Sequence, residues 1–346
     1  MQSNVAIHVV SAHAEGEVGN VIVGGVAPPP GNSLWAQRDF LHRDGQLRNL
    51  VLNEPRGGVF THMNLLVPAR HPDATYGFLT MEPEHTPPMS GSNSICVATV
   101  LLNTGILPIT GPVTEFNLEC AAGLLKVRAF CEGGRAQSVE ITNVASFADK
   151  LDAPLDVPGL GSFTVDTAFG GDSFVMINAD DLGLCLTPDE ARDIAKMGAK
   201  ITAAANDQIG FDHPSADWSH ISFCQFTLSV SQQADGLTGT SAVVIDPGKI
   251  DRSPCGTGCS ARLAVMAARG QIGLNQAYTG LSIIGGRFLC NIKEMTTING
   301  RPAIIPTLRG RAWITGTHQI LRDPEDPWPE GYRLTDTWPA PRHLDG

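Results

Sequence analysis

Two loops of the same design, one in each half of the chain, constrain the fold more than any other feature. Residues 89–94 read Met-Ser-Gly-Ser-Asn-Ser and precede an apolar segment that ends near Gly105. Residues 253–258 read Ser-Pro-Cys-Gly-Thr-Gly and precede a second such segment, which ends near Gly270. Small polar residues before an apolar segment and glycine after it are typical of the two ends of a helix. Because the loops lie 165 residues apart in a chain of 346, we predict a duplicated β-plus-α unit with one nucleophilic side chain at each helix N-terminus.

The remaining pattern is rich in β-structure. Short segments of alternating hydrophobicity occupy most of both halves, and 37 glycines and 24 prolines are spread along the chain, as expected for many strands joined by turns. A further helix is expected after Thr187-Pro188, where acidic residues occupy the first turn. Chains well above about 200 residues usually form more than one domain, so we expect two, at residues 1–164 and 165–346. The expected strands span residues 5–13, 19–25, 60–69, 115–120, 124–130, 162–169, 174–178, 221–230, 240–246, 281–290, 303–310 and 312–321.

The charge pattern argues against several classes of partner. The net charge is −11, and no cluster of Lys or Arg occurs. Nucleic acids and anionic membrane surfaces both require a basic footprint, so the expected partner is a small molecule. The first residues contain no basic region leading into a long apolar run, and no stretch of about 18 apolar residues follows. These features predict a soluble, cytoplasmic protein.

The eight cysteines are scattered along the chain, a pattern typical of reduced thiols rather than of a disulfide framework. Cys255 and Cys259 form a CxxxC pair without a second pair or a nearby cluster of histidines, which is a poor zinc signature. No glycine-rich phosphate loop and no lysine in a Schiff-base context are present. The sequence therefore predicts neither a metal nor an organic cofactor.

Both loops carry groups suited to acid–base chemistry. The positive end of a helix dipole lowers the pKa of a cysteine placed there and favours its thiolate, which is the expectation for Cys255. Free N–H groups of the same turn can hold a carboxylate, and Gly256 and Thr257 allow close approach and add a hydroxyl donor. Either nucleophile alone could equally be a helix cap, since serine is a preferred N-cap residue. The matched pair, Ser90 and Cys255, favours catalysis.

These residues resemble the two active-site signatures of the proline racemase superfamily. Residues 251–258, Asp-Arg-Ser-Pro-Cys-Gly-Thr-Gly, resemble the second signature, and residues 89–95 resemble the first, which in proline racemases usually reads Met-Cys-Gly-His. Similar segments extend over almost the whole length. They are His13 with Gly16-Glu17, Gly24-Gly25, and residues 54–57, 169–172, 316–319 and 323–327.

The resemblance implies an α+β fold like that of diaminopimelate epimerase. Two pseudo-symmetric halves would each wrap a β-barrel-like sheet around a central helix, with the active site in the cleft between them and a C-terminal tail that can cross back to the first half. It also implies that backbone amides of Gly91-Ser92 and Gly256-Thr257 hold the substrate carboxylate and ring nitrogen. Asp251 would lie near the ring amine. No cofactor is implied.

The chain departs from the proline racemase pattern at Ser90, which stands where the first cysteine would be, and at Ser92, where many relatives have histidine. A serine hydroxyl is a much weaker acid than a thiol, so symmetrical two-thiol racemisation of proline is not expected. Within the superfamily such pairs are associated with hydroxyproline substrates. We therefore hypothesise a trans-3-hydroxy-L-proline dehydratase that also epimerises hydroxyproline at C2, with Ser90 and Cys255 as the catalytic pair.

Three other interpretations remain at this stage. The nearest is a dedicated trans-4-hydroxy-L-proline 2-epimerase. A more distant one is an epimerase of acyclic substrates on the same fold, of the diaminopimelate type. The third, from another class, is a catalytically silent imino-acid-binding protein. A homodimer is possible in each case.

Overall fold

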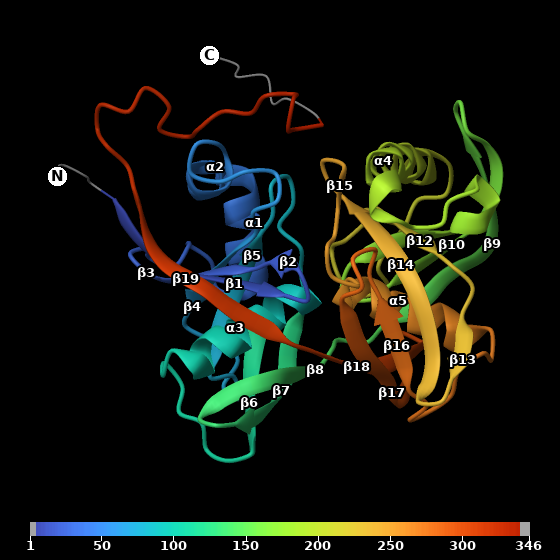
Figure 1. The fold of residues 1–346 in the computed structure, drawn as a ribbon, viewed down its shortest axis with the longest axis horizontal. Coiled ribbons are helices and arrows are strands. Elements are labelled where there is room, and N and C mark those ends of the chain that lie inside the picture. Colours follow the sequence, from blue (N-terminus) through green and yellow to red (C-terminus); the bar gives the residue numbers. More distant parts are fainter. Residues whose placement is uncertain (1–4, 340–346) are drawn as a thin grey trace. The chain divides into compact units, whose positions relative to one another are not determined.

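The computed structural model describes residues 5–339, whose contacts divide them into two compact units. Unit 1 contains the chain up to Val139 together with the chain from Arg311 onward, and unit 2 is Glu140–Gly310. Figure 1 labels the elements of each unit.

Unit 1 contains seven strands in one hydrogen-bonded order. The β3–β4 and β5–β6 pairs are parallel, and the other neighbours are antiparallel. A short strand, β2 (Glu17–Val18), pairs with the end of β1. The order is β19 (Ala312–Leu321), β1 (Ala6–Ala14), β3 (Asn20–Gly24), β4 (Met63–Val67), β5 (Tyr76–Met81), β6 (Val113–Cys120) and β7 (Gly123–Glu132).

Unit 2 repeats this arrangement. Its parallel pairs are β11–β12 and β14–β16, and the other neighbours are antiparallel. The order is β9 (Phe147–Val157), β10 (Gly161–Phe169), β11 (Ser173–Asn178), β12 (Phe223–Thr227), β14 (Gly236–Ile245), β16 (Tyr278–Leu281), β17 (Arg287–Ile298) and β18 (Arg301–Gly310). The short strands β13 (Ser231–Gln233) and β15 (Lys249–Ile250) both pair with β14. Strand β8 (Arg135–Thr142) spans the point where the chain passes from unit 1 to unit 2.

The helices occupy matching places in the two strand orders. Helix α3 (Gly91–Asn103) connects the parallel strands β5 and β6, and α5 (Gly256–Ala268) lies between the parallel strands β14 and β16. Outer helices connect the other parallel pair of each unit. These are α1 (Leu34–Asp44) and α2 (Gln46–Leu52) in unit 1, and α4 (Ala191–Gln208), preceded by short 3-10 turns at Ala179–Leu182 and Pro188–Glu190, in unit 2. The duplication inferred from the two loops is therefore present.

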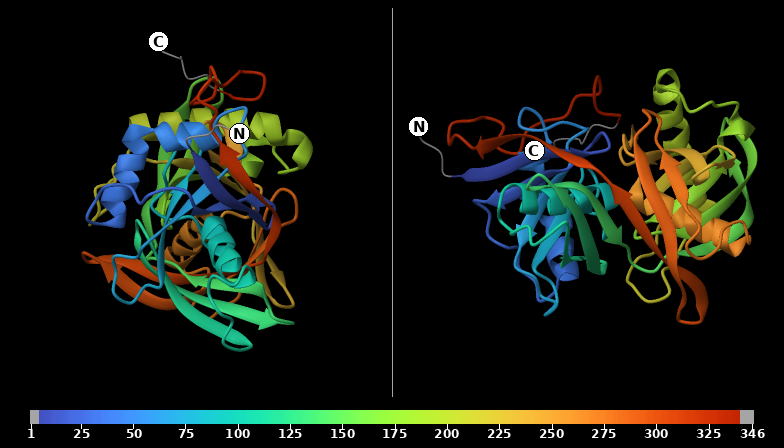
Figure 2. Two further views of the ribbon diagram at one scale, coloured as in Figure 1. Left: turned by 90° about the vertical axis from the view of Figure 1, so that its left-hand side faces the viewer. Right: turned by 60° about the horizontal axis from the view of Figure 1, so that its bottom comes forward.

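Each unit wraps its sheet around its central helix. In unit 1, α3 contacts β19 and β7, which are the two ends of the strand order, as well as β1 and β3. In unit 2, α5 contacts the two end strands β9 and β18. Every residue from Gly91 to Leu102 is buried, as is every residue from Gly256 to Met266. A helix that is buried on all sides needs apolar and small residues all round, as both sequences have. Figure 2 shows strands around these helices from two further directions.

The boundary between units differs from the expected one at residues 164 and 165. Residues 147–157 form β9, which is hydrogen-bonded to β10 of unit 2, so this segment belongs to unit 2. Residues 312–321 form β19, which is hydrogen-bonded to β1 of unit 1. The C-terminal strand thus takes in unit 1 the place beside β1 that β9 takes beside β10 in unit 2.

The outer helix expected after Thr187-Pro188 is α4. A capping box precedes it, in which a Glu190 carboxylate oxygen accepts from the backbone N–H of Thr187 at 2.7 Å. The helix packs its buried face against β14, and a Cβ at Gly198 would overlap the side chain of Val244. Reciprocal capping satisfies backbone groups that the helix itself leaves without partners.

Other segments were not anticipated or differ from expectation. The predicted strand 281–290 is divided between β16 and β17 by a turn at Gly285, which has φ 81°. Strands β5, β8 and β9 and helices α1 and α2 were not predicted. Helix α1 begins after Ser33, whose hydroxyl accepts from the N–H of Ala36 at 3.1 Å.

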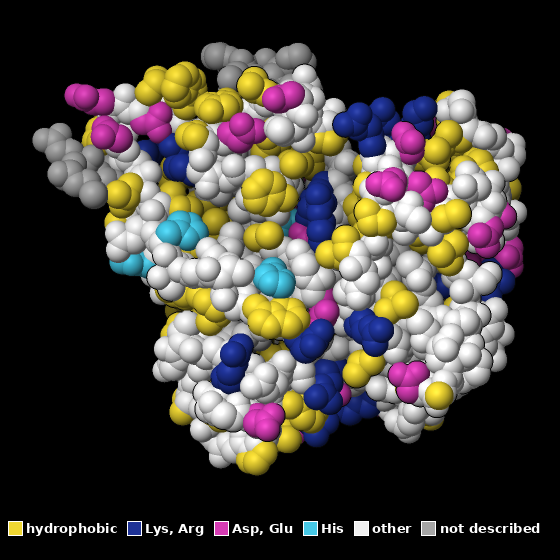
Figure 3. Space-filling view, viewed as in Figure 1, with side chains coloured by type: hydrophobic (Ala, Val, Ile, Leu, Met, Phe, Trp, Pro, Cys, Tyr) yellow, Lys and Arg dark blue, Asp and Glu magenta, His cyan; other side chains and the backbone are white. Residues whose placement is uncertain are grey.

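Within residues 5–339 no helix combines the length and apolar character that crossing a membrane requires. On the face drawn in Figure 3, acidic side chains occur among the basic ones.

Candidate active site

The residue before the central helix of unit 1 is Ser90. Its backbone is extended, with φ −139° and ψ 123°, and its side chain does not cap the helix. The carbonyl of Ser90 instead accepts from Ser94, from the backbone N–H at 3.0 Å and from the hydroxyl at 2.6 Å. The Ser90 hydroxyl is therefore not engaged in the capping role that a serine in this place commonly has.

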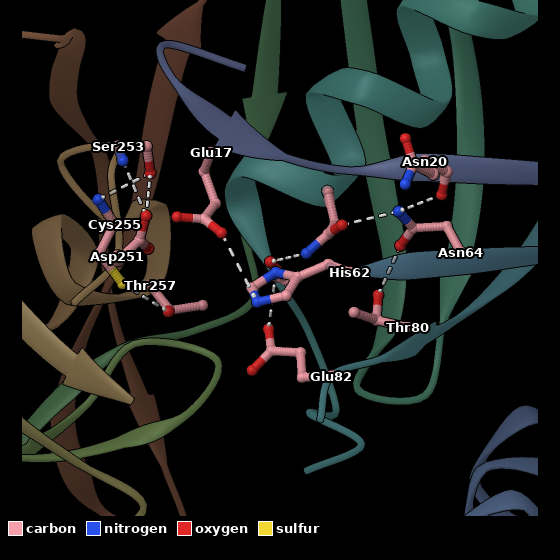
Figure 4. Close-up of polar contacts among 12 residues, drawn as sticks. Glu17, Asn20, His62, Asn64, Thr80, Glu82, Asp251, Ser253, Cys255 and Thr257 are labelled. Atoms are coloured by element: carbon pink, nitrogen blue, oxygen red, sulfur yellow. Dashed lines mark hydrogen bonds and ion pairs between the residues drawn. The ribbon is translucent and has the colours of Figure 1, made fainter. Parts of the chain in front are cut away.

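A chain of polar side chains leads to the Ser90 hydroxyl. The amide nitrogen of Asn93 donates to Ser90 Oγ at 2.8 Å, and the amide nitrogen of Asn64 donates to Asn93 Oδ1 at 2.6 Å. Asn64 also donates to the carbonyl of Asn20 at 3.1 Å and accepts from the Thr80 hydroxyl at 3.0 Å. Figure 4 shows Asn20, Asn64 and Thr80 of this chain. Asn64 and Asn93 are fully buried and Thr80 is 5% exposed, whereas Asn20 and Ser90 at the two ends of this row of side chains are partly exposed.

A buried histidine lies beside this row of hydrogen-bonded side chains, between two carboxylates. His62 Nε2 is 3.6 Å from Glu17 Oε1, and His62 Nδ1 is 3.6 Å from Glu82 Oε1 (Figure 4). None of the three side chains is more than 6% exposed. His62 and Asn64 are two residues apart, so they point to the same face of their segment. This pair was not predicted, although two polar residues on one face of an otherwise apolar strand were a signal in the sequence.

Three buried arginines hold the segment between β5 and α3. Arg48 of α2 and Arg333 of the C-terminal segment both donate to the carbonyl of Pro83, at 3.0 and 2.9 Å. Arg38 of α1 donates to the carbonyl of Thr86 at 2.5 Å. Buried backbone carbonyls need such partners. The outer helices and the C-terminal segment thus hold in place the segment that leads into residues 89–94.

The residue before the central helix of unit 2 is Cys255. Its backbone has φ 62° and ψ 106°, a conformation that costs a non-glycine residue about 1–3 kcal/mol. Its Sγ accepts from the N–H of Gly258 at 3.4 Å and lies 3.4 Å from the hydroxyl of Thr257. Strain of this kind persists only where the surroundings impose it.

Asp251 and Ser253 fix the backbone before Cys255. Asp251 Oδ1 accepts from the N–H of Ser253 at 2.8 Å and from its hydroxyl at 2.9 Å. The oxygen of that hydroxyl accepts in turn from the N–H of Cys255 at 3.1 Å. Figure 4 shows these three residues with Thr257. Asp251 therefore holds the loop in place.

The expected low pKa of Cys255 is wrong for the protein alone. Burial raises the pKa of this thiol well above its usual range, and the charge of Asp251 raises it further. Hydrogen bonds from Thr257 and Gly258 act in the opposite direction and are outweighed. Removal from water disfavours the charged form of such a group, so burial rather than the helix end dominates the pKa of Cys255.

The predicted binding residues occupy equivalent places in the two units. Gly91 and Ser92 are the first two residues of α3, and Gly256 and Thr257 are the first two of α5. Backbone N–H groups in the first turn of a helix have no partner within the helix, and such an end is generally suited to an anion. The structure brings Asp251, Cys255 and their neighbours together in unit 2, and Ser90 with its neighbours in unit 1. Among residues 5–339, no group of three or more His, Cys, Asp or Glu side chains is placed to hold a metal ion.

A sequence profile of the proline racemase family matches residues 9–333. The chain belongs to the proline racemase family. One solved structure to which this family member is similar is a hydroxyproline epimerase from Agrobacterium vitis with bound trans-4-hydroxy-L-proline. It is 36% identical, with a TM-score of 0.93 over 98% of this chain and 97% of that one. Another is a probable proline racemase from Agrobacterium radiobacter K84 with bound carbonate, 38% identical, with a TM-score of 0.92 over 96% and 98% of the two chains.

More distant likeness concerns the fold alone. A PhzF-family phenazine biosynthesis protein from Bacillus anthracis is 12% identical, with a TM-score of 0.57 over 93% of this family member and 100% of that chain. The predicted superfamily and the predicted α+β, epimerase-like fold are both confirmed. The chain is an enzyme of the proline racemase family, whose similar solved members include a hydroxyproline epimerase.

Proposed function

We propose that this enzyme removes the C2 proton of a hydroxyproline without a cofactor, epimerises hydroxyproline at C2, and dehydrates trans-3-hydroxy-L-proline to pyrroline-2-carboxylate. Ser90 and Cys255 are the proposed acid–base pair. The observation that carries this assignment is their matching place, since each is the residue immediately before the buried central helix of its unit. Membership of the proline racemase family supports chemistry at C2.

The same helix ends supply the proposed binding groups. Backbone N–H groups of Gly91, Ser92, Gly256 and Thr257 are suited to the substrate carboxylate, because a helix N-terminus favours negative charge. Asp251 is the proposed partner of the cationic ring amine. A carboxylate also becomes a better electron sink when N–H donors surround it, which helps C2 to lose its proton.

The proposed reaction begins when the Cys255 thiolate takes the C2 proton and the electron pair moves towards the carboxylate. In epimerisation, the Ser90 hydroxyl then gives its proton to the opposite face of C2. In dehydration, the electron pair forms a C2–C3 double bond while the 3-hydroxyl leaves with a proton as water, and the resulting enamine tautomerises to the cyclic imine. In trans-3-hydroxy-L-proline the C2 hydrogen and the 3-hydroxyl lie on the same face of the ring. The weak acidity of serine slows reprotonation and leaves time for elimination.

A dedicated trans-4-hydroxy-L-proline 2-epimerase is the second candidate. It is favoured by the similarity to the Agrobacterium vitis epimerase, whose structure contains trans-4-hydroxy-L-proline. A hydroxyl on C4 is not adjacent to the C2 carbanion, so elimination cannot follow and only the epimer forms.

The test is incubation of the protein in D₂O with trans-3-hydroxy-L-proline, trans-4-hydroxy-L-proline and L-proline. Imine formation and deuterium at C2 are followed together. We expect imine from the 3-hydroxy substrate and deuterated C2 epimer from the 4-hydroxy substrate. Epimer without imine from the 3-hydroxy substrate would establish the second candidate, and exchange of plain proline alone would contradict both.

A catalytically silent binding protein makes a different prediction. Pyrrole-2-carboxylate is a planar mimic of the C2 carbanion, and in an active enzyme it should protect Cys255 from alkylation. A silent protein would show no C2 exchange with any of the three substrates and no such protection.

A further inference from the structure

The hydrogen bonds in unit 1 determine which way the buried amides point. The carbonyl oxygen of Asn20 can only accept, so the Asn64 atom 3.1 Å from it must be the NH₂ nitrogen. The Asn64 oxygen then faces the Thr80 hydroxyl, which donates to it at 3.0 Å. The backbone carbonyl of Asn20 thus fixes the orientation of the first amide.

The second amide follows from the first. Asn64 directs its NH₂ group at Asn93, so the Asn93 atom 2.6 Å away must be the oxygen. Asn93 can then present only its NH₂ group to Ser90, whose Oγ lies 2.8 Å away and accepts. Turning either amide round would bring two donors or two acceptors face to face in a buried place. Because a hydroxyl has a single hydrogen, Ser90 keeps that hydrogen available for a group other than Asn93.

The elements that carry these amides are paired and closely packed. Asn64 and Thr80 are directly paired residues of the antiparallel strands β4 and β5. Asn93 lies in the first turn of α3, and Gly19 packs closely against it, since a Cβ there would lie 3.0 Å from Asn93 Oδ1. Residues of β3, β4, β5 and α3 are thus linked by hydrogen bonds into one row that ends at the Ser90 hydroxyl.

Unit 2 has no row of hydrogen-bonded amides beside Cys255 that corresponds to Asn64 and Asn93 of unit 1. The third residue of α5 is Gly258 where α3 has Asn93. The strands β11, β12 and β14 correspond to β3, β4 and β5, and they contribute Phe174, Phe223, Val243 and Ile245 to the apolar cluster that contains Cys255. The buried amide of these strands, Gln225, donates to Ser241 and not to Cys255. The amide chain accompanies the serine and not the thiol.

We infer that Asn93 is a positioning residue that holds Ser90 as a proton donor, with Asn64 and Thr80 keeping Asn93 in the required orientation. This inference rests on the proposed function and adds a residue to it. A donor aimed at Ser90 Oγ also stabilises the negative charge that develops on that oxygen as its proton leaves. Within the described part of the chain, Cys255 Sγ has no side-chain amide as a partner, and instead accepts from the backbone N–H of Gly258 and lies 3.4 Å from the hydroxyl of Thr257.

The sharpest variant is Asn93→Asp, which keeps the oxygen that Asn64 needs and replaces only the NH₂ group that faces Ser90. The Ser90 hydroxyl would then turn to donate to the new carboxylate and no longer to substrate. Using trans-4-hydroxy-L-proline and its C2 epimer in D₂O, we expect inversion to fall at least about tenfold, within the range that a general acid contributes. For the epimer that presents its C2 proton to Cys255, deuterium exchange with retention should persist. The ratio of inversion to exchange is the readout, and KM should change little.

The matched control is Ser94→Ala, which removes a hydrogen bond to the Ser90 carbonyl but leaves Ser90 Oγ untouched. We expect its ratio to match the wild type. If Asn93→Asp does not fold, Asn93→Ala replaces it as the test variant. We then expect a smaller fall in the ratio of inversion to exchange. In a Ser90→Ala background, Asn93→Asp should have no further effect on the ratio, because the residue acts through Ser90.

The outcomes separate the two claims. If the wild type inverts hydroxyproline and the Asn93 variants lose inversion and exchange in equal proportion, the positioning role is wrong while the proposed function stands. If the wild type neither inverts nor exchanges any hydroxyproline, both fail.

Discussion

The two central helices begin in the same way, but the residues immediately before them, Ser90 and Cys255, stand in opposite surroundings. Ser90 has an ordinary extended backbone and a hydroxyl tied to a row of buried amides. Cys255 has a strained backbone with φ 62° and packs among apolar side chains. The helix end is common to both units, as expected if both turns serve the proposed binding of the substrate carboxylate. The strands facing the helix differ, and they match the chemistry of the residue they surround.

The difference also shows where each unit is constrained. In unit 1 the constraint acts on a side chain, through hydrogen bonds that orient the hydroxyl. In unit 2 it acts on the backbone, where Asp251 and Ser253 hold the segment before Cys255. For the proposed proton transfer, the sulfur of Cys255 must be held at the right position. The hydroxyl of Ser90 must be held at the right position and also with its hydrogen in the right direction. The comparison can be tested by exchanging or altering the features that differ.

The largest effect is expected from Cys255→Ser. A serine there would lack both a low enough pKa and the amide donors that serve Ser90, so we expect a loss of at least about 10³-fold in kcat for every C2 reaction, within the range for an essential acid–base group. Ser90→Cys should instead keep C2 exchange and shift the product ratio towards reversible epimerisation. Steady-state assays of imine and epimer measure both.

The comparison between the two units fails if Cys255→Ser and Ser90→Cys have the same effect on the C2 reactions. Retained turnover in Cys255→Ser would remove Cys255 from its proposed role. An unchanged product ratio in Ser90→Cys would show that slow proton donation by serine does not determine the balance between dehydration and epimerisation.

Sequence alone predicted the features that depend on local pattern. The two helix N-termini were predicted from glycine and small polar residues, and most strands from alternation of apolar residues. The chain's departure at Ser90 was also visible in the sequence. Each of these signals lies within about ten neighbouring residues.

What sequence missed depends on contacts between distant residues. The link between Asn64 and Asn93 joins positions 29 residues apart and exists only once β4 has packed on α3. Strand β19 belongs to unit 1 because it pairs with β1, some 300 residues earlier in the chain. The pKa of Cys255 was misjudged because the helix dipole can be inferred from sequence, whereas the depth of burial that outweighs it cannot.

A second test concerns how closely each sheet approaches its helix. A Cβ at Gly170 would overlap the carbonyl oxygen of Thr257 and lie 2.5 Å from the backbone nitrogen of Ala261. A Cβ at Gly19 would lie 2.8 Å from Cys96 Sγ, a side-chain atom that can move. We expect Gly170→Ala to destabilise by about 3 kcal/mol or more and Gly19→Ala by about 1–2 kcal/mol, since overpacking against backbone cannot relax by rotamer change.

Urea unfolding of the two glycine variants measures this difference. Because the chain has two units, transitions should be followed by probes in each, and a single free energy assigned only where they coincide. Equal destabilisation would mean that α5 can shift as readily as the Cys96 side chain.

The smallest effect is expected from Thr257→Val, which removes the hydroxyl 3.4 Å from Cys255 Sγ and keeps the shape of the side chain. That hydroxyl lowers the pKa of the thiol, so its loss should raise the pKa further. At a fixed pH near 9, alkylation of Cys255 by iodoacetamide should slow by roughly threefold, because only the thiolate reacts.

In the wild type the rate should keep rising with pH above 9, as a raised pKa requires. Peptide mass spectrometry separates Cys255 from the exposed Cys185, which is the internal control. A rate that levels off below pH 8 would show a thiolate already present at neutral pH, and burial would then not be the dominant influence on Cys255.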